Sequence, residues 1–149
     1  MKRFMIFALF IGTALLLTGC LEPAKYTGGG SLDSVICGEK ANFGFVFNGC
    51  KDDPMGVFNY HDMADGVKMK GELKEIKGEN EVTVYYRSTN PKYRGEGIAK
   101  LEFYDMGEGN EDHGWLKIKV YTGPFAGYRN EGIIQGNIQE HECNDDCDD

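Results

Sequence analysis

Two histidines and an aspartate are the residues with the clearest metal-binding chemistry. His61 and Asp62 are adjacent, and His141 lies near the C-terminal end of the sequence. Imidazole nitrogens and carboxylate oxygens are common ligands of zinc and other transition metals. If the strands that contain the two histidines are neighbours in a sheet, the three side chains form one metal site. The alternative is a histidine whose ring is hydrogen-bonded to a nearby backbone carbonyl group.

The acidic segment 107–112 is a second candidate metal site, in which Glu108, Glu111 and Asp112 supply oxygen ligands. Calcium prefers six to eight oxygen ligands, and glycine lets a loop wrap around the ion. The spacing does not match an EF-hand loop, so a solvated acidic loop is the alternative. No organic cofactor is expected, because the sequence has no phosphate-binding glycine loop and no dinucleotide-binding motif.

Three aromatic residues in expected loops, Tyr93, Phe125 and Tyr128, are candidate ligand contacts. Exposed aromatic rings on a β-protein can stack on sugars, whereas the alternative is that they fill the core or form cross-strand pairs. The three serines of the chain lie outside any nucleophile-elbow motif. We therefore expect no catalytic residue and no enzyme activity.

Residues 1–19 have the organisation of an export signal. Two basic residues precede an apolar stretch at residues 4–17, which is too short for a membrane-spanning helix. The stretch ends in Leu17-Thr18-Gly19-Cys20, which resembles the bacterial lipobox. The resemblance implies cleavage after Gly19, a diacylglyceryl group on the Cys20 sulfur and an acylated new amino terminus. Two or more acyl chains make such an anchor stable. An ordinary signal peptide is the alternative.

Removal of residues 1–19 leaves 130 residues, enough for one domain with a real core. The removed segment contains two of the 16 basic residues and none of the 24 acidic ones, so the net charge changes from −8 to −10. This acidity disfavours nucleic acid as a partner. The expected partners are the membrane, through the lipid anchor, and an envelope protein or polysaccharide.

With Cys20 assigned to lipid, the other cysteines form an even set of four: Cys37, Cys50, Cys143 and Cys147. In an exported chain this predicts two disulfides, and four cysteines allow three pairings. We favour Cys37–Cys50, because the chain between them can return as a hairpin, which leaves Cys143–Cys147. The rival joins Cys37 and Cys50 each to a tail cysteine. Zinc ligation by all four is weaker, because there is no Cys-x-x-Cys pair.

Alternation of apolar and polar residues is the main structural pattern, and no convincing amphipathic helix is present. It predicts about seven antiparallel strands at hairpin spacing, in an all-β small barrel or two-sheet sandwich. The expected strands are residues 41–48, 57–61, 67–74, 82–87, 98–104, 115–121 and 132–139.

The sequence divides into four expected parts. They are a lipoprotein signal peptide at 1–19, a lipid-anchored tether at 20–36, the all-β domain at 37–142 and an acidic cysteine-containing tail at 143–149. The tether is predicted from Pro23 and from the flexible run Gly28-Gly29-Gly30-Ser31.

Five short phrases resemble, in their order, the post-COAP domain of bacterial secreted and surface proteins. They occupy residues 41–45, 56–62, 66–71, 127–132 and 136–141. The resemblance covers roughly residues 41–141, and it implies a small all-β module outside the cytoplasm with no assigned activity.

Together these patterns predict an extracytoplasmic lipoprotein on the cell membrane or the outer membrane. Its β-domain is expected to be a non-catalytic binding or structural module. A calcium- or metal-binding envelope lipoprotein and a small envelope hydrolase are the alternatives.

Overall fold

The structure is a computed structural model that describes residues 24–105 and 114–143. Within these two ranges the chain forms nine antiparallel strands and no helix. The strands are β1 (Ala24–Asp33), β2 (Lys40–Asn48), β3 (Met55–Asp62), β4 (Val67–Lys77), β5 (Glu81–Ser88), β6 (Glu96–Asp105), β7 (Gly114–Val120), β8 (Arg129–Ile133) and β9 (Gln135–Glu142).

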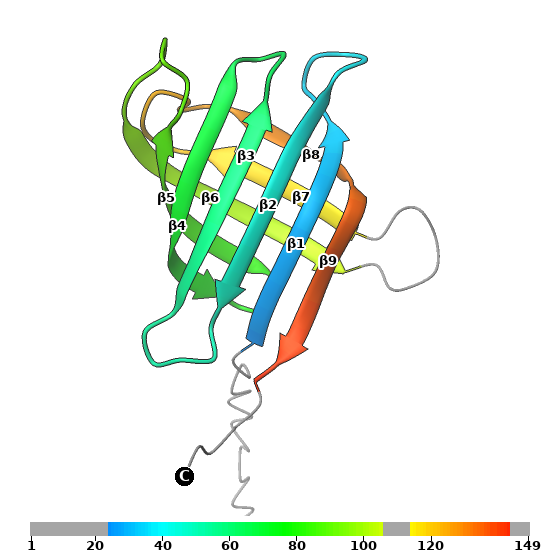
Figure 1. Ribbon diagram of the computed structural model, residues 1–149, viewed down its shortest axis with the longest axis vertical. Coiled ribbons are helices and arrows are strands. Elements are labelled where there is room, and N and C mark those ends of the chain that lie inside the picture. The colour runs from blue at the N-terminus through cyan, green and yellow to red at the C-terminus, as the bar shows by residue number, and fades with distance from the viewer. Residues whose placement is uncertain (1–23, 106–113, 144–149) are drawn as a thin grey trace, which may run out of the picture.

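The strands form one sheet in the order β8-β7-β6-β5-β4-β3-β2-β1-β9. Only Ile134 separates β8 from β9, yet β8 pairs with β7 and β9 pairs with β1. The sheet therefore curls until its two ends meet, and β6 and β7 cross behind β1 to β4 (Figure 1). The all-β prediction is confirmed, and the architecture is a nearly closed, barrel-like sheet.

Two facing glycines allow the chain to make this change of partner. Gly30 of β1 and Gly136 of β9 are opposite in the register, with φ angles of 152° and 154° that glycine tolerates best. A Cβ atom on Gly136 would overlap the carbonyl oxygen of Gly29. The two backbones thus approach too closely for side chains. The preceding Ile134 is fully buried, and its N–H donates to the carbonyl of Gly114 at 3.0 Å.

The core depends on aromatic rings that lie over inward-facing glycines. One inward row follows the register across six strands: Gly28, Phe45, Phe58, Gly71, Tyr86 and Gly97. A Cβ on Gly28 would lie 2.5 Å from Cζ of Phe45, so this glycine makes room for the ring. Rings from both layers then meet, because Phe103 of β6 packs 5.0 Å from Phe45 and 5.1 Å from Tyr26 between ring centroids.

The expected tether at residues 20–36 is wrong for residues 24–33, which form β1. This strand lies inside the sheet between β2 and β9, and its Tyr26 and Leu32 are buried. The glycine run hides the alternation of the strand, because its inward positions need space rather than side chains. Among the described residues the domain therefore begins at Ala24, not at residue 37.

The number of strands is nine rather than the expected seven. One added strand is β1. The last expected strand, at residues 132–139, is interrupted at Ile134 and contributes to both β8 and β9.

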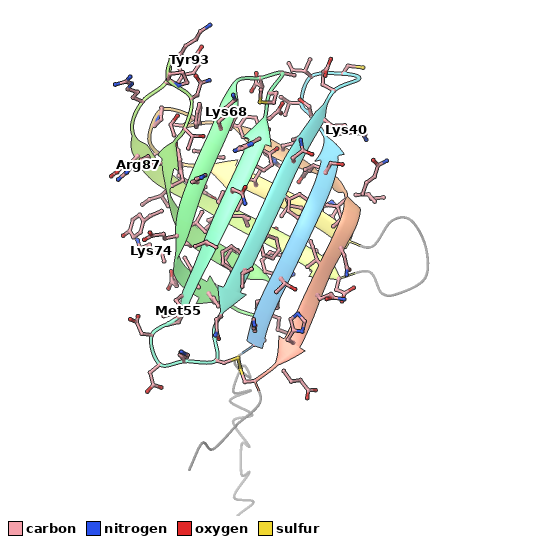
Figure 2. All side chains as sticks on the ribbon, in the orientation of Figure 1. Lys40, Met55, Lys68, Lys74, Arg87 and Tyr93 are labelled. Carbon is pink, nitrogen blue, oxygen red and sulfur yellow. A yellow bond between two sulfur atoms is a disulfide. The ribbon has the colours of Figure 1, made fainter. Side chains whose placement is uncertain are left out.

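The favoured pairing Cys37–Cys50 is also wrong, because Cys50 bonds to Cys143 with a Cα–Cα distance of 5.4 Å. Cys37 is exposed and unpaired at the other end of β2. A nine-residue strand spans about 30 Å, far beyond the reach of a disulfide. The rival is confirmed for Cys50, which bonds to a tail cysteine, but not for Cys37, which is free; Cys147 lies outside the described residues. Figure 2 shows the bridge at the end of the molecule opposite Tyr93.

Removal of the bridge should destabilise the fold. The disulfide joins residues 93 positions apart, so it restricts the unfolded chain strongly. We expect the double variant Cys50→Ser/Cys143→Ser to lower the free energy of unfolding by about 2–5 kcal/mol in urea denaturation. The matched variant Cys37→Ser should match the parent, and equal losses in both variants would contradict this assignment.

The crossing at Gly136 gives a second prediction. Gly136→Ala should lower the free energy of unfolding by about 1–3 kcal/mol, because the added methyl group meets the Gly29 carbonyl at a strained φ angle. Gly132→Ala in β8 is the control, since a Cβ there meets no atom within 4 Å. Thermal denaturation of the two variants measures the difference, and equal melting temperatures would count against the close crossing.

Candidate functional site

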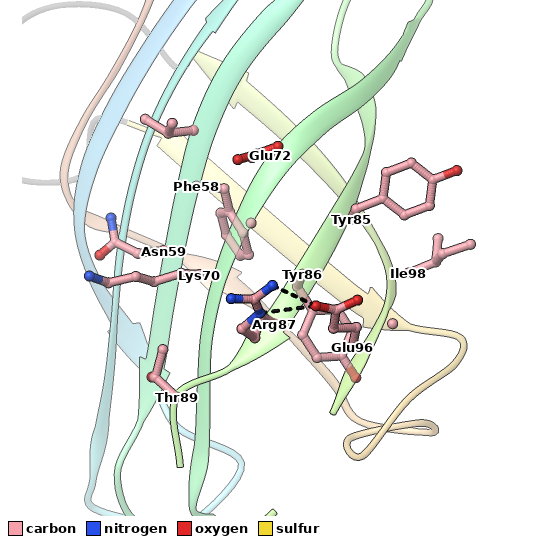
Figure 3. A pocket seen from close by; sticks show the side chains of 13 residues that line it. Phe58, Asn59, Lys70, Glu72, Tyr85, Tyr86, Arg87, Thr89, Glu96 and Ile98 are labelled. Atoms are coloured by element: carbon pink, nitrogen blue, oxygen red, sulfur yellow. Dashed lines mark hydrogen bonds and ion pairs between the residues drawn. The ribbon is translucent and has the colours of Figure 1, made fainter. Parts of the chain in front are cut away.

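A groove of about 960 Å³ crosses the outer face of β3 to β6. Its floor is the backbone of the inward row at Phe58, Gly71, Tyr86 and Gly97, and the side chains of Phe58 and Tyr86 are buried on the opposite face. Successive residues of a strand alternate between faces, so the residues on either side of this row point outward and form two walls. Figure 3 shows the groove with its lining side chains.

The two walls are rows of residues in register across the four strands. The first row is Val57, Glu72, Tyr85 and Ile98, and the second is Asn59, Lys70, Arg87 and Glu96. In Figure 3, Asn59 and Lys70, from β3 and β4, lie on one side of the Arg87–Glu96 pair, and Tyr85 and Ile98, from β5 and β6, lie on the other. The first wall is mainly apolar and the second is entirely polar.

The polar wall is held in position by hydrogen bonds along the surface. Nε and Nη2 of Arg87 donate to Oε1 of Glu96 at 3.0 and 2.7 Å. Both side chains are mostly exposed, so the pair adds little to stability, but it fixes the two groups relative to each other. Nδ2 of Asn59 donates to the carbonyl of Gly44 at 3.1 Å. The wall therefore presents oriented donors and acceptors.

The apolar wall exposes large side chains where an outward strand position usually has a polar one. Val57 is 61% exposed and Tyr85 is 52% exposed. The ammonium group of Lys74 lies 4.8 Å from the centroid of the Tyr85 ring, a cation–π contact that restrains the ring. Clustered apolar side chains on a surface commonly mark a binding site.

The predicted contact residues Tyr93, Phe125 and Tyr128 do lie together, at the end of the barrel away from the disulfide. They line a depression of about 260 Å³ with Asp65 and Pro124 among its other residues. Phe125 is buried, however, with its ring centroid 6.0 Å from that of Tyr86. Of the predicted three, only Tyr93 is largely exposed. Their role in ligand contact stays a prediction.

Tyr128 belongs to a hydrogen-bonded chain beneath this depression. Its hydroxyl donates to the fully buried carboxylate of Asp62 at 2.8 Å, and Oγ of Ser34 donates to the same carboxylate at 2.8 Å. The Tyr60 hydroxyl lies 2.7 Å from that of Tyr128, and Nδ2 of Asn130 donates to Tyr60 at 2.9 Å. The chain links β3 to β8 and to the segments next to them, which supports closure of the barrel.

The two tyrosines of this hydrogen-bonded chain stay protonated over a wide pH range. Burial raises the pKa of Tyr60 to about 12, although its hydrogen bonds with Tyr128 and Asn130 oppose the shift. Burial also raises the pKa of Tyr128, and the nearby Tyr60 and Asp62 add to the shift. Both hydroxyls therefore remain hydrogen-bond donors at neutral pH, which suits a structural role.

The predicted metal site of His61, Asp62 and His141 does not form. The strands β3 and β9 are separated by β2 and β1, so the two histidines are not neighbours. His61 lies on the outer face in register with Lys68, whereas Asp62 points inward. Nε2 of His141 instead lies 3.0 Å from Oγ1 of Thr27.

No group of three metal-ligating side chains occurs within residues 24–105 and 114–143. The other candidate ligands, Glu108, Glu111 and Asp112, lie outside the described residues. Calcium binding by the acidic segment therefore stays a prediction.

No family model, no curated protein and no solved structure matches this chain. The resemblance to the post-COAP domain consequently stays a prediction. In the part of the chain that the structure describes, we find no helix that is long and apolar enough to cross a membrane.

The groove was missed at the sequence level, although part of its signal was visible. Outward positions of the alternating strands hold Val57, Tyr85 and Ile98, where a solvated face favours polar residues. The register that aligns these residues across four strands is a tertiary property. Only the folded sheet therefore shows that they form one wall.

The raised tyrosine pKa values predict loss of stability at alkaline pH. An unfolded tyrosine ionises near pH 10, whereas Tyr60 holds its proton until about pH 12. The stabilising contribution is complete below pH 10 and is lost as the pH rises through about 12. We expect the free energy of unfolding to fall over this window in denaturant titrations followed by tyrosinate absorbance. A free energy of unfolding that is constant from pH 9 to 12 would contradict the burial of these tyrosine hydroxyls.

Proposed function

We propose that this chain is an exported lipoprotein, acylated at Cys20 and held on the outer side of a membrane. The lipobox-like segment supports the acylation. The Cys50–Cys143 disulfide supports export, because disulfides persist mainly in oxidising compartments. The two observations are independent and favour the same location.

On this proposal the β-domain sits directly above the membrane. Ala24 begins β1 only four residues after Cys20, so the link spans at most about 14 Å. The Ala24 end is also the disulfide end, because N–H of Gly49 donates to the carbonyl of Ala24 beside Cys50. The strands therefore rise from the anchored end, and the groove opens on the side of the barrel.

We further propose that the domain is a non-catalytic binding module and that the groove is its binding site. The observation that supports this most is the pairing of an apolar wall with a polar wall across one floor. In the polar wall, the pair of Arg87 and Glu96 uses only Nε and Nη2 of the guanidinium and Oε1 of the carboxylate, so both groups can also hydrogen-bond a ligand. The proposed partner is an envelope protein or polysaccharide; the acidity of the chain disfavours nucleic acid.

Lipidation is tested by Cys20→Ala in a bacterial host. The parent should incorporate labelled palmitate and fractionate with membranes, because two or more acyl chains anchor stably. Cys20→Ala should lose the label, and Cys37→Ala should keep it. Labelling of Cys20→Ala equal to that of the parent would refute the anchor.

Binding is tested with a soluble chain of residues 20–149 that carries Cys20→Ala and lacks the apolar segment. It is incubated with purified envelope fractions: peptidoglycan, extracted polysaccharides and outer-surface proteins. Sedimentation or pull-down should show retention on one fraction, and chromatography should show that fraction unchanged. Release of fragments would instead establish the hydrolase. No retention on any fraction would refute the binding role.

A further inference from the structure

We propose that the groove binds an uncharged linear polysaccharide, with successive sugar rings lying across β3 to β6. This inference rests on the proposed function of the groove as a binding site, and it adds the chemical class of the ligand. Three features of the groove support it.

The first feature is the chemistry of the two walls. A sugar ring has an apolar face of C–H groups and a rim of hydroxyl groups. Val57, Tyr85 and Ile98 can contact the C–H face, and the half-exposed Tyr85 ring offers a stacking surface. The amide of Asn59 and the charged groups of Arg87 and Glu96 supply donors and acceptors for the hydroxyl rim.

The second feature is the floor, which has no free main-chain groups to offer. All four strands are internal to the sheet and pair on both sides. An extended peptide commonly binds a sheet by adding a strand at an open edge. This groove lies away from any edge, so its ligand must be recognised by side chains, as sugars are.

The third feature is charge. Lys70 and Arg87 are balanced by Glu72 and Glu96, so the lining has no net charge. The rest of the chain is strongly acidic and repels polyanions. An uncharged polymer has no charge that the groove would have to balance, and the acidic domain does not repel it.

The apolar wall is also long enough for a polymer. Val46 of β2 continues it in register with Val57, and Tyr121 continues it beyond Ile98. Both added side chains are exposed. From β2 to the end of β7 the row follows the curved outer surface over five strand spacings of about 4.8 Å, or about 24 Å along the curve. Several linked sugar rings fit along it.

The test is calorimetric titration of a soluble chain of residues 20–149, with Cys20→Ala and without the apolar segment, with defined glycans. Neutral linear oligosaccharides of glucose, mannose, xylose and N-acetylglucosamine are compared with polygalacturonate and hyaluronan as charged polymers. We expect binding to at least one neutral series, tighter for longer oligomers, and no binding to the charged polymers. Binding to the charged polymers alone would overturn the inference.

Variants locate the site. Tyr85→Ala and Asn59→Ala should each weaken binding roughly tenfold, as expected for losing a stacking or hydrogen-bonding contact. Tyr104→Ala is the matched control, because Tyr104 is 51% exposed but lies outside the groove. Circular dichroism confirms folding of all three. Equal affinity of Tyr85→Ala, Asn59→Ala and the parent would overturn the inference.

The outcomes separate the two proposals. Retention on an envelope protein, with no binding to any neutral glycan, overturns the polysaccharide inference and leaves the binding module standing. Absence of binding to every envelope fraction and every glycan overturns both.

Discussion

The change of pairing partner at Ile134 is the constraint on which the rest of the structure depends. The residues before it pair with β7 and those after it pair with β1, so one short turn joins the two ends of the sheet. Gly30 and Gly136 permit the close crossing. A buried hydrogen-bonded chain also stabilises the closed sheet by linking β3 to β8; it consists of Asp62, Tyr128, Tyr60 and Asn130. Strand pairing alone would leave a curved open sheet; the crossing makes it barrel-like.

Closure determines what kind of surface is left for binding. Because β3 to β6 lie far from the seam, their backbone groups are paired on both sides. Recognition there must come from outward side chains, and the register arranges these in rows of opposite character. On the inner side of the same strands, Phe58 and Tyr86 fill the core beneath the floor, and Gly71 lies between them. One set of registers therefore sets both the packing and the groove.

Sequence patterns predicted the fold class and most strands, because alternation is local. The phenylalanines at 43, 45 and 47 alternate along the expected strand at residues 41–48, and all three are buried. Patterns failed where a residue's role depends on distant partners. The run Gly28-Gly29-Gly30 looked like a tether, but its small residues accommodate Phe45 and Gly136. Cys50 finds Cys143 across the end of β1, a neighbour that only the topology supplies. The predicted loop aromatics lie together in one depression. The groove could not be predicted, because its residues are brought together only by the register of four strands.

The groove and the depression lined by Tyr93, Phe125 and Tyr128 are two surfaces that could hold a ligand, and we assign the ligand to the groove. Chemical-shift mapping by nuclear magnetic resonance distinguishes them, with the isotope-labelled soluble domain titrated with a glycan that it binds. We expect the largest shifts at the floor amides of Phe58, Gly71, Tyr86 and Gly97. Shifts confined to Tyr93, Phe125 and Tyr128 would place the ligand in the depression and refute the assignment.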